Sequence, residues 1–176
     1  GTYAALGYSE ASGIPFEMGM IRNHYVGRTF IQPTQSMRDF GVRVKLNPVK
    51  KLLKGKDIVI IEDSIIRGTT AKTRVKAFID LEVKKIHILM AVQPHQFPCH
   101  YAIDFSTKGE LIAAKMSIEK LRDYLGLESL HYLSINGLLR STGVAEPQNH
   151  FCKACFDGCY PVQFDVNLSK DCLEKI

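Results

Sequence analysis

The sequence contains no apolar run that approaches the roughly 18 residues needed to cross a membrane. It has no initiating methionine and no secretion signal, and it opens on residues with helical spacing, so we expect a chain that lacks an N-terminal part. Its lysines and arginines are dispersed and show no aromatic interleaving, which argues against a nucleic-acid partner. These absences predict a cytoplasmic protein with neither a membrane nor a nucleic acid as its partner.

The composition is that of an ordinary folded domain. The chain has 176 residues, of which 45% are hydrophobic and 23% are charged, and it shows no internal repeat or low-complexity segment. The net charge of +5 is compatible with a phosphorylated substrate. Five cysteines without a secretion signal favour reduced thiols or metal ligands over disulfides.

The stretch from Ile58 to Thr70 carries the strongest functional signal. Four β-branched residues in a row, Ile58 to Ile61, are typical of a strand that is covered on both faces in a parallel sheet. Glu62 and Asp63 follow at the carboxyl end of that strand, which is where open α/β sheets bind ligands. The sequence therefore predicts an acidic ligand-binding edge at this point.

The residues after the acidic pair are typical of a tight turn and a helix start. Gly68 is free to take backbone angles that other residues avoid, and a helix from about 70 to 81, capped by Thr69 or Thr70, is expected to follow. Backbone N–H groups at a helix start, with the hydroxyls of Ser64, Thr69 and Thr70, make a site suited to a phosphate. Since adjacent carboxylates suit sugar hydroxyls or Mg²⁺, the combination predicts a ribose 5-phosphate site.

A plainer interpretation of the same pattern is a strand that ends in an acidic, helix-capping turn. The full thirteen-residue string favours the phosphosugar site over that interpretation. The turn is neither a Walker loop nor a dinucleotide-binding loop, because it lacks both Gly-Lys-Ser/Thr and G-x-G-x-x-G. The histidines show no metal spacing, and no Ser/His/Asp arrangement is identifiable.

The string Glu62-Asp-Ser-Ile-Ile-Arg-Gly-Thr-Thr70 resembles the phosphoribosylpyrophosphate (PRPP) loop of type I phosphoribosyltransferases. Its amino-acid sequence is most similar to the corresponding loop of the glutamine PRPP amidotransferases. The resemblance implies that Glu62 and Asp63 bind Mg²⁺ and that both residues also act in catalysis. It implies that PRPP is bound by Glu62, Asp63, Ser64, Ile65, Ile66, Arg67, Gly68, Thr69 and Thr70.

A long polar segment upstream resembles the flexible loop of the same family. The matching stretches are Tyr25-Val-Gly-Arg-Thr-Phe-Ile-Gln-Pro33 and Val44-Lys-Leu-Asn47. The resemblance implies a lid that closes over PRPP, with Arg28 and Lys45 as catalytic cations and with Thr29 as a further PRPP contact. One departure is His24, where the family usually has arginine. Without the resemblance, this basic stretch would be interpreted as a solvated surface.

Two of the cysteines form a C-x-x-C pair, Cys152 and Cys155. Alone, this pair is compatible with a redox site, half a zinc site or half an iron–sulfur site, although a thioredoxin-like context is absent. One class of the amidotransferases holds a [4Fe–4S] cluster on four cysteines. The resemblance implies Cys99, Cys152 and Cys155 as three ligands, with the fourth upstream of this chain. Cys159 and Cys172 match no ligand of that class, and ordinary thiols or zinc are the alternatives.

The resemblance covers nearly the whole chain and implies the α/β fold of type I phosphoribosyltransferases, a mostly parallel sheet with flanking helices and an irregular C-terminal tail. We expect a synthase domain over residues 1–140 and a cluster-binding tail over 141–176. The expected helices are Tyr3–Ser12, Pro48–Lys54, Thr107–Ala114 with a Thr107/Glu110 capping box, Ser117–Leu125 and Ile135–Arg140; the other expected strands are Lys85–Val92 and His131–Ser134.

The reaction implied by the resemblance attacks C1 of PRPP with ammonia from a glutaminase domain and expels pyrophosphate, which is the first step of purine synthesis. It further implies purine nucleotides as inhibitors and a homo-oligomer, such as a tetramer. Two alternatives stay open from the residues themselves. One is a nucleobase-salvage phosphoribosyltransferase, for which no base-binding segment is visible, and the other is a non-catalytic PRPP-sensing module.

Overall fold

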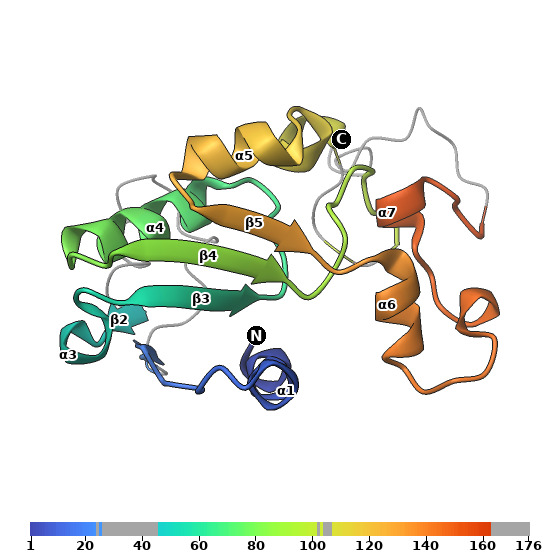
Figure 1. Ribbon diagram of the computed structural model, residues 1–176. Coiled ribbons are helices and arrows are strands. Elements are labelled where there is room, and N and C mark those ends of the chain that lie inside the picture. Colours follow the sequence, from blue (N-terminus) through green and yellow to red (C-terminus); the bar gives the residue numbers. More distant parts are fainter. Residues whose placement is uncertain (24, 26–45, 102, 104–106, 163–176) are drawn as a thin grey trace.

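The computed structural model describes residues 1–23, 25, 46–101, 103 and 107–162 (Figure 1). The helices are α1 (Thr2–Ser12), α3 (Lys50–Leu53), α4 (Thr69–Asp80), α5 (Ile118–Leu125), α6 (Ile135–Arg140) and α7 (Ala154–Asp157), and the strands are β1 (Met20–Arg22), β2 (Leu46–Pro48), β3 (Asp57–Glu62), β4 (Lys85–Met90) and β5 (Ser129–Tyr132). The described residues also form the short 3₁₀ helices η2 (Lys108–Glu110), η3 (Ile112–Ala114) and η4 (Pro147–Asn149). No helix in this part of the chain has the length and apolar character that a membrane span requires.

The central sheet consists of β3, β4 and β5 in that order, and both pairings are parallel. Successive strands are joined through α4 and then through η2, η3 and α5, as parallel pairing requires a crossover. β1 and β2 form a separate antiparallel pair. The predicted parallel α/β architecture is confirmed. The carboxyl ends of β3, β4 and β5 lie at the same edge of the sheet (Figure 1).

The hydrophobic core lies between the sheet and the helices α4 and α5. β4 alternates along its length so that Ile86, Ile88 and Met90 are buried. They belong to one apolar cluster with Val75 and Phe78 of α4 and with residues of α5. In Figure 1, α1 lies beside β3 and α5 beside β5. The core therefore fixes α4 against the strand that carries the acidic pair.

Several helix ends follow the predicted signals. α1 ends at Gly13, which takes a left-handed conformation with φ 74°, and α5 ends at Gly126 with φ 79°. The hydroxyl of Ser117 caps α5 by accepting a hydrogen bond from the Lys120 backbone N–H at 3.3 Å. Ser134 caps α6 in the same way.

The predicted helix over 107–114 is wrong in its form. This segment holds two 3₁₀ turns separated by Leu111, which is extended and fully buried. Burial of Leu111 therefore overrides the helical spacing. The predicted capping box is also absent, because Thr107 makes no side-chain cap and Glu110 binds Arg67. The last strand begins two residues earlier than predicted, at Ser129.

Candidate functional site

The turn between β3 and α4 forms the centre of the candidate site. β3 includes Glu62 as its last residue, and the exposed Asp63 follows it directly. Gly68 precedes α4 in a left-handed conformation with φ 78°, and its carbonyl accepts the first helical hydrogen bond from Lys72 N–H at 2.9 Å. The N-cap residue is therefore Gly68, and the predicted capping by Thr69 or Thr70 is wrong.

The turn is held in place by the 3₁₀ segment that follows β4. The Ile112 backbone N–H donates a hydrogen bond to the Ile66 carbonyl at 2.8 Å. A Cβ atom built on Gly68 would lie 2.4 Å from Cδ1 of Ile112. Arg67 Nη2 donates to Glu110 Oε1 at 3.0 Å. Glycine is therefore required here both by backbone conformation and by close packing.

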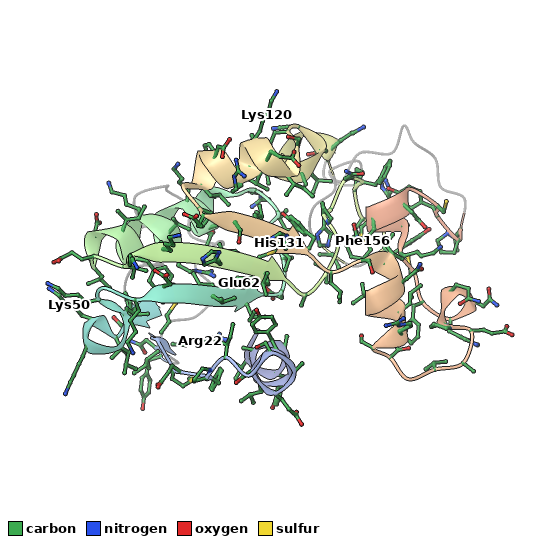
Figure 2. All side chains as sticks on the ribbon, viewed as in Figure 1. Arg22, Lys50, Glu62, Lys120, His131 and Phe156 are labelled. Atoms are coloured by element: carbon green, nitrogen blue, oxygen red, sulfur yellow. The ribbon has the colours of Figure 1, made fainter. Side chains whose placement is uncertain are left out.

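The acidic pair points in two directions. Side chains alternate along a strand, so Glu62 lies on the face of Ile58 and Ile60, which pack against the core under α4. The Glu62 carboxylate is bound to the guanidinium of Arg74 on α4. The Asp63 side chain is exposed, and its Oδ1 accepts a hydrogen bond from the Ser64 N–H at 2.9 Å. Figure 2 shows Glu62 at the carboxyl end of β3.

Arg74 is the residue of this site that sequence reasoning missed. Its side chain is 18% exposed, and burial lowers the pKa of its guanidinium. Its Nε atom is buried and has no hydrogen-bond partner in the part of the chain that the structure describes. Arg74 lies outside the turn, since five residues separate it from Gly68 along α4. The only sequence signal for it is its place next to the buried Val75, because helical periodicity can bring such a polar residue close to the sheet.

The start of α4 has the features of an anion site. Its first N–H groups have no partner within the helix, as at any helix start, and α4 extends over 12 residues. The side chains of Thr69 and Thr70 are exposed, and neither they nor Ser64 cap the helix. A phosphate beside the Asp63 carboxylate fits this arrangement.

The predicted lid residues Arg28, Thr29 and Lys45 lie outside the described residues, as does the departure at His24. The remaining residues assigned to PRPP, from Glu62 to Thr70, lie together in one strand end, one turn and one helix start. Among them, Ile65 is buried and anchors the turn to the core.

The C-terminal segment packs against the loop that follows β4. The backbone N–H groups of Gln96 and Phe97 both donate to the Cys155 carbonyl at 3.1 Å. The Tyr160 hydroxyl donates to the Pro98 carbonyl at 2.7 Å. A Cβ on Gly158 would lie 2.9 Å from the Phe97 ring. Segments about sixty residues apart therefore bring the predicted cysteine ligands into one region.

Within that region, the thiol of Cys155 is half-buried, and burial raises its pKa to about 11. Neighbouring Cys99 and Cys152 act in the same direction, so the three thiols lie close enough to interact electrostatically. Among the described residues, however, no group of three His, Cys, Asp or Glu side chains is arranged to hold a metal ion. Cys159 is exposed, and Cys172 lies outside the described part of the chain.

Comparisons with known proteins identify relatives over the whole chain, although no family model matches. The chain is 48% identical over 178 aligned residues to the amidophosphoribosyltransferase of Synechococcus elongatus, and the match covers 100% of this chain. It is 45% identical over 163 residues to amidophosphoribosyltransferase 2, chloroplastic, of Arabidopsis thaliana, with 93% of this chain covered. The chain is homologous to amidophosphoribosyltransferases. The predicted family resemblance is confirmed.

The comparison with solved structures finds the same family as the comparison with sequences. The glutamine PRPP amidotransferase of B. subtilis complexed with ADP and GMP matches with a TM-score of 0.81 at 42% identity and covers 97% of this chain. A structure described as the allosteric regulatory enzyme of purine biosynthesis matches with a TM-score of 0.82 at 41% identity. These matches confirm the predicted phosphoribosyltransferase-type fold. The chain spans 36% of the length of the Synechococcus relative and 29% of the Arabidopsis relative.

Proposed function

We propose that this chain is the phosphoribosyltransferase part of an amidophosphoribosyltransferase. It would form 5-phosphoribosylamine from PRPP and ammonia and release pyrophosphate. One observation carries this proposal: an exposed carboxylate at the end of β3 lies directly before a glycine-bounded turn and the start of a helix. That arrangement suits an anionic phosphate on one side and a sugar diol on the other, and its relatives are named for this chemistry.

The roles of the residues follow from their positions. The N–H groups at the start of α4, with Ser64, Thr69 and Thr70, would bind the 5-phosphate. Glu62 and Asp63 would serve the ribose hydroxyls and Mg²⁺, which commonly takes one or two carboxylates together with substrate phosphates. Bound Mg²⁺ would offset charge on the departing pyrophosphate.

The lid assignment extends this proposal to residues outside the described part of the chain. Arg28 and Lys45 would add positive charge to the pyrophosphate side, and Thr29 would contact PRPP. Closing such a lid would exclude water, which competes with ammonia for the ribose carbon. Preorganised positive charge of this kind is worth several kcal/mol to the transition state.

We also propose that Cys99, Cys152 and Cys155 contribute three ligands to a [4Fe–4S] cluster whose fourth ligand lies outside this chain. The electrostatic proximity of the three thiols supports this assignment. The side chains would have to turn toward one another, since they do not form a ligand set as they stand. Iron and acid-labile sulfide measured on anaerobically purified protein test it, and a stoichiometric zinc content would overturn it.

The proposed partners are those expected for an amidophosphoribosyltransferase. Ammonia would come from a glutaminase domain, and purine nucleotides would inhibit, since the B. subtilis structure contains ADP and GMP. A cytoplasmic homo-oligomer, such as a tetramer, is the proposed assembly. Residues 1–140 would form the synthase domain and 141–176 the cluster-binding tail, whose described part packs on the loop after β4.

Pyrophosphate release from PRPP and Mg²⁺ tests the main proposal, with ammonium as the varied substrate and glutamine as the control. We expect release that depends on ammonium and not on glutamine. Free purine bases, added in place of ammonium, test the salvage alternative. PRPP binding by calorimetry without release under any condition would favour a sensing module, and no binding would overturn the assignment of the β3–α4 turn.

A further inference from the structure

The ion pair between Glu62 and Arg74 lies next to the exposed carboxylate of the candidate site. Glu62 is the last residue of β3 and Arg74 lies in the second turn of α4. Their side chains are only 22% and 18% exposed, and the guanidinium contacts the carboxylate directly. The pair therefore ties the end of the strand to the helix at the position immediately before Asp63.

Residues of the hydrophobic core lie near both members of this pair along the chain. Ile60 lies on the same strand face, and Val75 and Phe78 on α4 belong to the core cluster. Apolar residues at both positions would extend that core, and replacing a buried ion pair in this way is often neutral or stabilising. Among the described residues, the buried Nε donor of Arg74 also has no hydrogen-bond partner, which is costly. Packing and stability therefore do not explain the pair.

The charge balance at the β3–α4 turn explains the Glu62–Arg74 ion pair. Two adjacent carboxylates without a cation would repel each other and would repel the phosphates of PRPP. Arg74 offsets the charge of Glu62 and fixes its carboxylate toward α4. Asp63 is left exposed with its Oδ1 oriented by the Ser64 N–H. The two carboxylates are thus separated into one that is held by the protein and one that faces outward.

We propose that Arg74 is a positioning residue for PRPP and Mg²⁺ binding. It holds Glu62 against α4 and offsets its charge, while the Asp63 carboxylate, which has no ion-pair partner among the described residues, stays exposed toward the ribose hydroxyls and the metal. This inference rests on the proposed function and assigns the two acidic residues different tasks within it. Arg74 then acts through Glu62, by fixing the position and the charge of that carboxylate at the end of the strand beside Asp63.

Steady-state kinetics with ammonium test this proposal in four variants. Arg74→Met should raise the KM for PRPP about tenfold and raise the Mg²⁺ concentration for half-maximal rate, with a smaller change in kcat. Arg74→Lys keeps the charge without the planar fork and should recover part of the loss. Glu62→Gln with Arg74→Met removes both charges and should bring the KM below that of Arg74→Met alone. Lys76→Met is the matched control, because Lys76 is exposed on the same helix.

The outcomes separate this inference from the proposed function. Wild-type protein without ammonium-dependent release would contradict the proposed function itself. Active wild-type protein whose PRPP and Mg²⁺ dependence is unchanged in Arg74→Met would overturn the positioning role, and so would a double variant whose KM for PRPP is no lower than that of Arg74→Met. An equal KM increase in Lys76→Met would do the same, since it would reflect net charge alone. If Arg74→Met does not fold, Arg74→Lys decides instead, because it leaves no carboxylate unpaired, and a PRPP and Mg²⁺ dependence equal to that of the wild type would then overturn the role.

Discussion

The β3–α4 turn and the cysteine region are assembled in opposite ways. The turn is built from thirteen consecutive residues, Ile58 to Thr70, whose strand, acidic pair and glycine follow one another in the chain. The cysteine region depends on hydrogen bonds between the loop after β4 and residues about sixty positions later. The first can therefore be inferred from local pattern, whereas the second exists only once the chain has folded.

Asp63→Asn should have the largest effect on the local site. The exposed carboxylate would lose its charge toward the ribose and Mg²⁺, and we expect kcat/KM to fall about a hundredfold or more. The unfolding temperature should stay unchanged, because the side chain is not buried. Asp57→Asn, at the other end of β3 and also exposed, is the control and should keep its activity.

Gly68→Ala should come next in size, and it tests the geometry of the turn. Alanine would be strained at φ 78°, and its Cβ would meet Ile112 Cδ1 at 2.4 Å. We expect a loss of about 2 kcal/mol in the free energy of unfolding, with weaker PRPP binding. Gly109 lies in the adjacent 3₁₀ segment, and no described atom would lie within 4 Å of a Cβ there, so Gly109→Ala should leave both quantities unchanged. Equal stability of the two variants would contradict this account.

The local elements show how far sequence patterns extend. The β-branched run predicts β3, and helical spacing with a hydroxyl or glycine cap predicts α1 and α5, because these signals act within one helical turn. The turn itself is predicted for the same reason. Its N-cap is not, because a left-handed glycine and a threonine both suit that position, and packing against Ile112 decides between them.

The features that the sequence does not predict all depend on distant partners. Arg74 is one of several basic residues on α4 until folding brings it against Glu62. Glu110 fits a capping box by spacing, but Arg67, 43 positions earlier, takes its carboxylate. Buried Leu111 converts an apparent helix into two 3₁₀ turns. In each case a tertiary contact outweighs a local preference worth less than about 1 kcal/mol.

Gly158→Ala tests the packing of the cysteine region in the way that Gly68→Ala tests the packing of the β3–α4 turn. Gly158 has φ 76°, and a Cβ there would lie 2.9 Å from the Phe97 ring, which belongs to the distant loop. Gly143→Ala is the matched control, because Gly143 has a similar φ of 68° but no described atom within 4 Å of a Cβ built there. We expect Gly158→Ala to be less stable than Gly143→Ala by about 1 kcal/mol in chemical unfolding. PRPP binding should be the same in both, and a shared loss of binding would mean that the two regions are coupled.

The smallest effect expected is a pH-dependent difference in thiol reactivity within the cysteine region. Because the thiolate reacts with iodoacetamide and burial raises the pKa of Cys155 to about 11, Cys155 should be alkylated more slowly at about pH 8 than the exposed Cys152 and Cys159. Since the folded-state pKa lies above the ordinary value of 9.0, the protonated thiol favours folding. That contribution is complete below pH 9 and is lost as the pH rises through about 11.

Mass spectrometry of the alkylated peptides across this pH range measures the difference. The gap between Cys155 and Cys159 should close as the pH approaches 11 in the metal-free protein. A bound cluster would instead protect Cys99, Cys152 and Cys155 together and leave Cys159 reactive. Gly158→Ala should speed Cys155 alkylation at about pH 8, because it loosens the contact that buries the thiol. Equal rates for Cys155 and Cys159 at that pH would show that the distant segments do not pack as described.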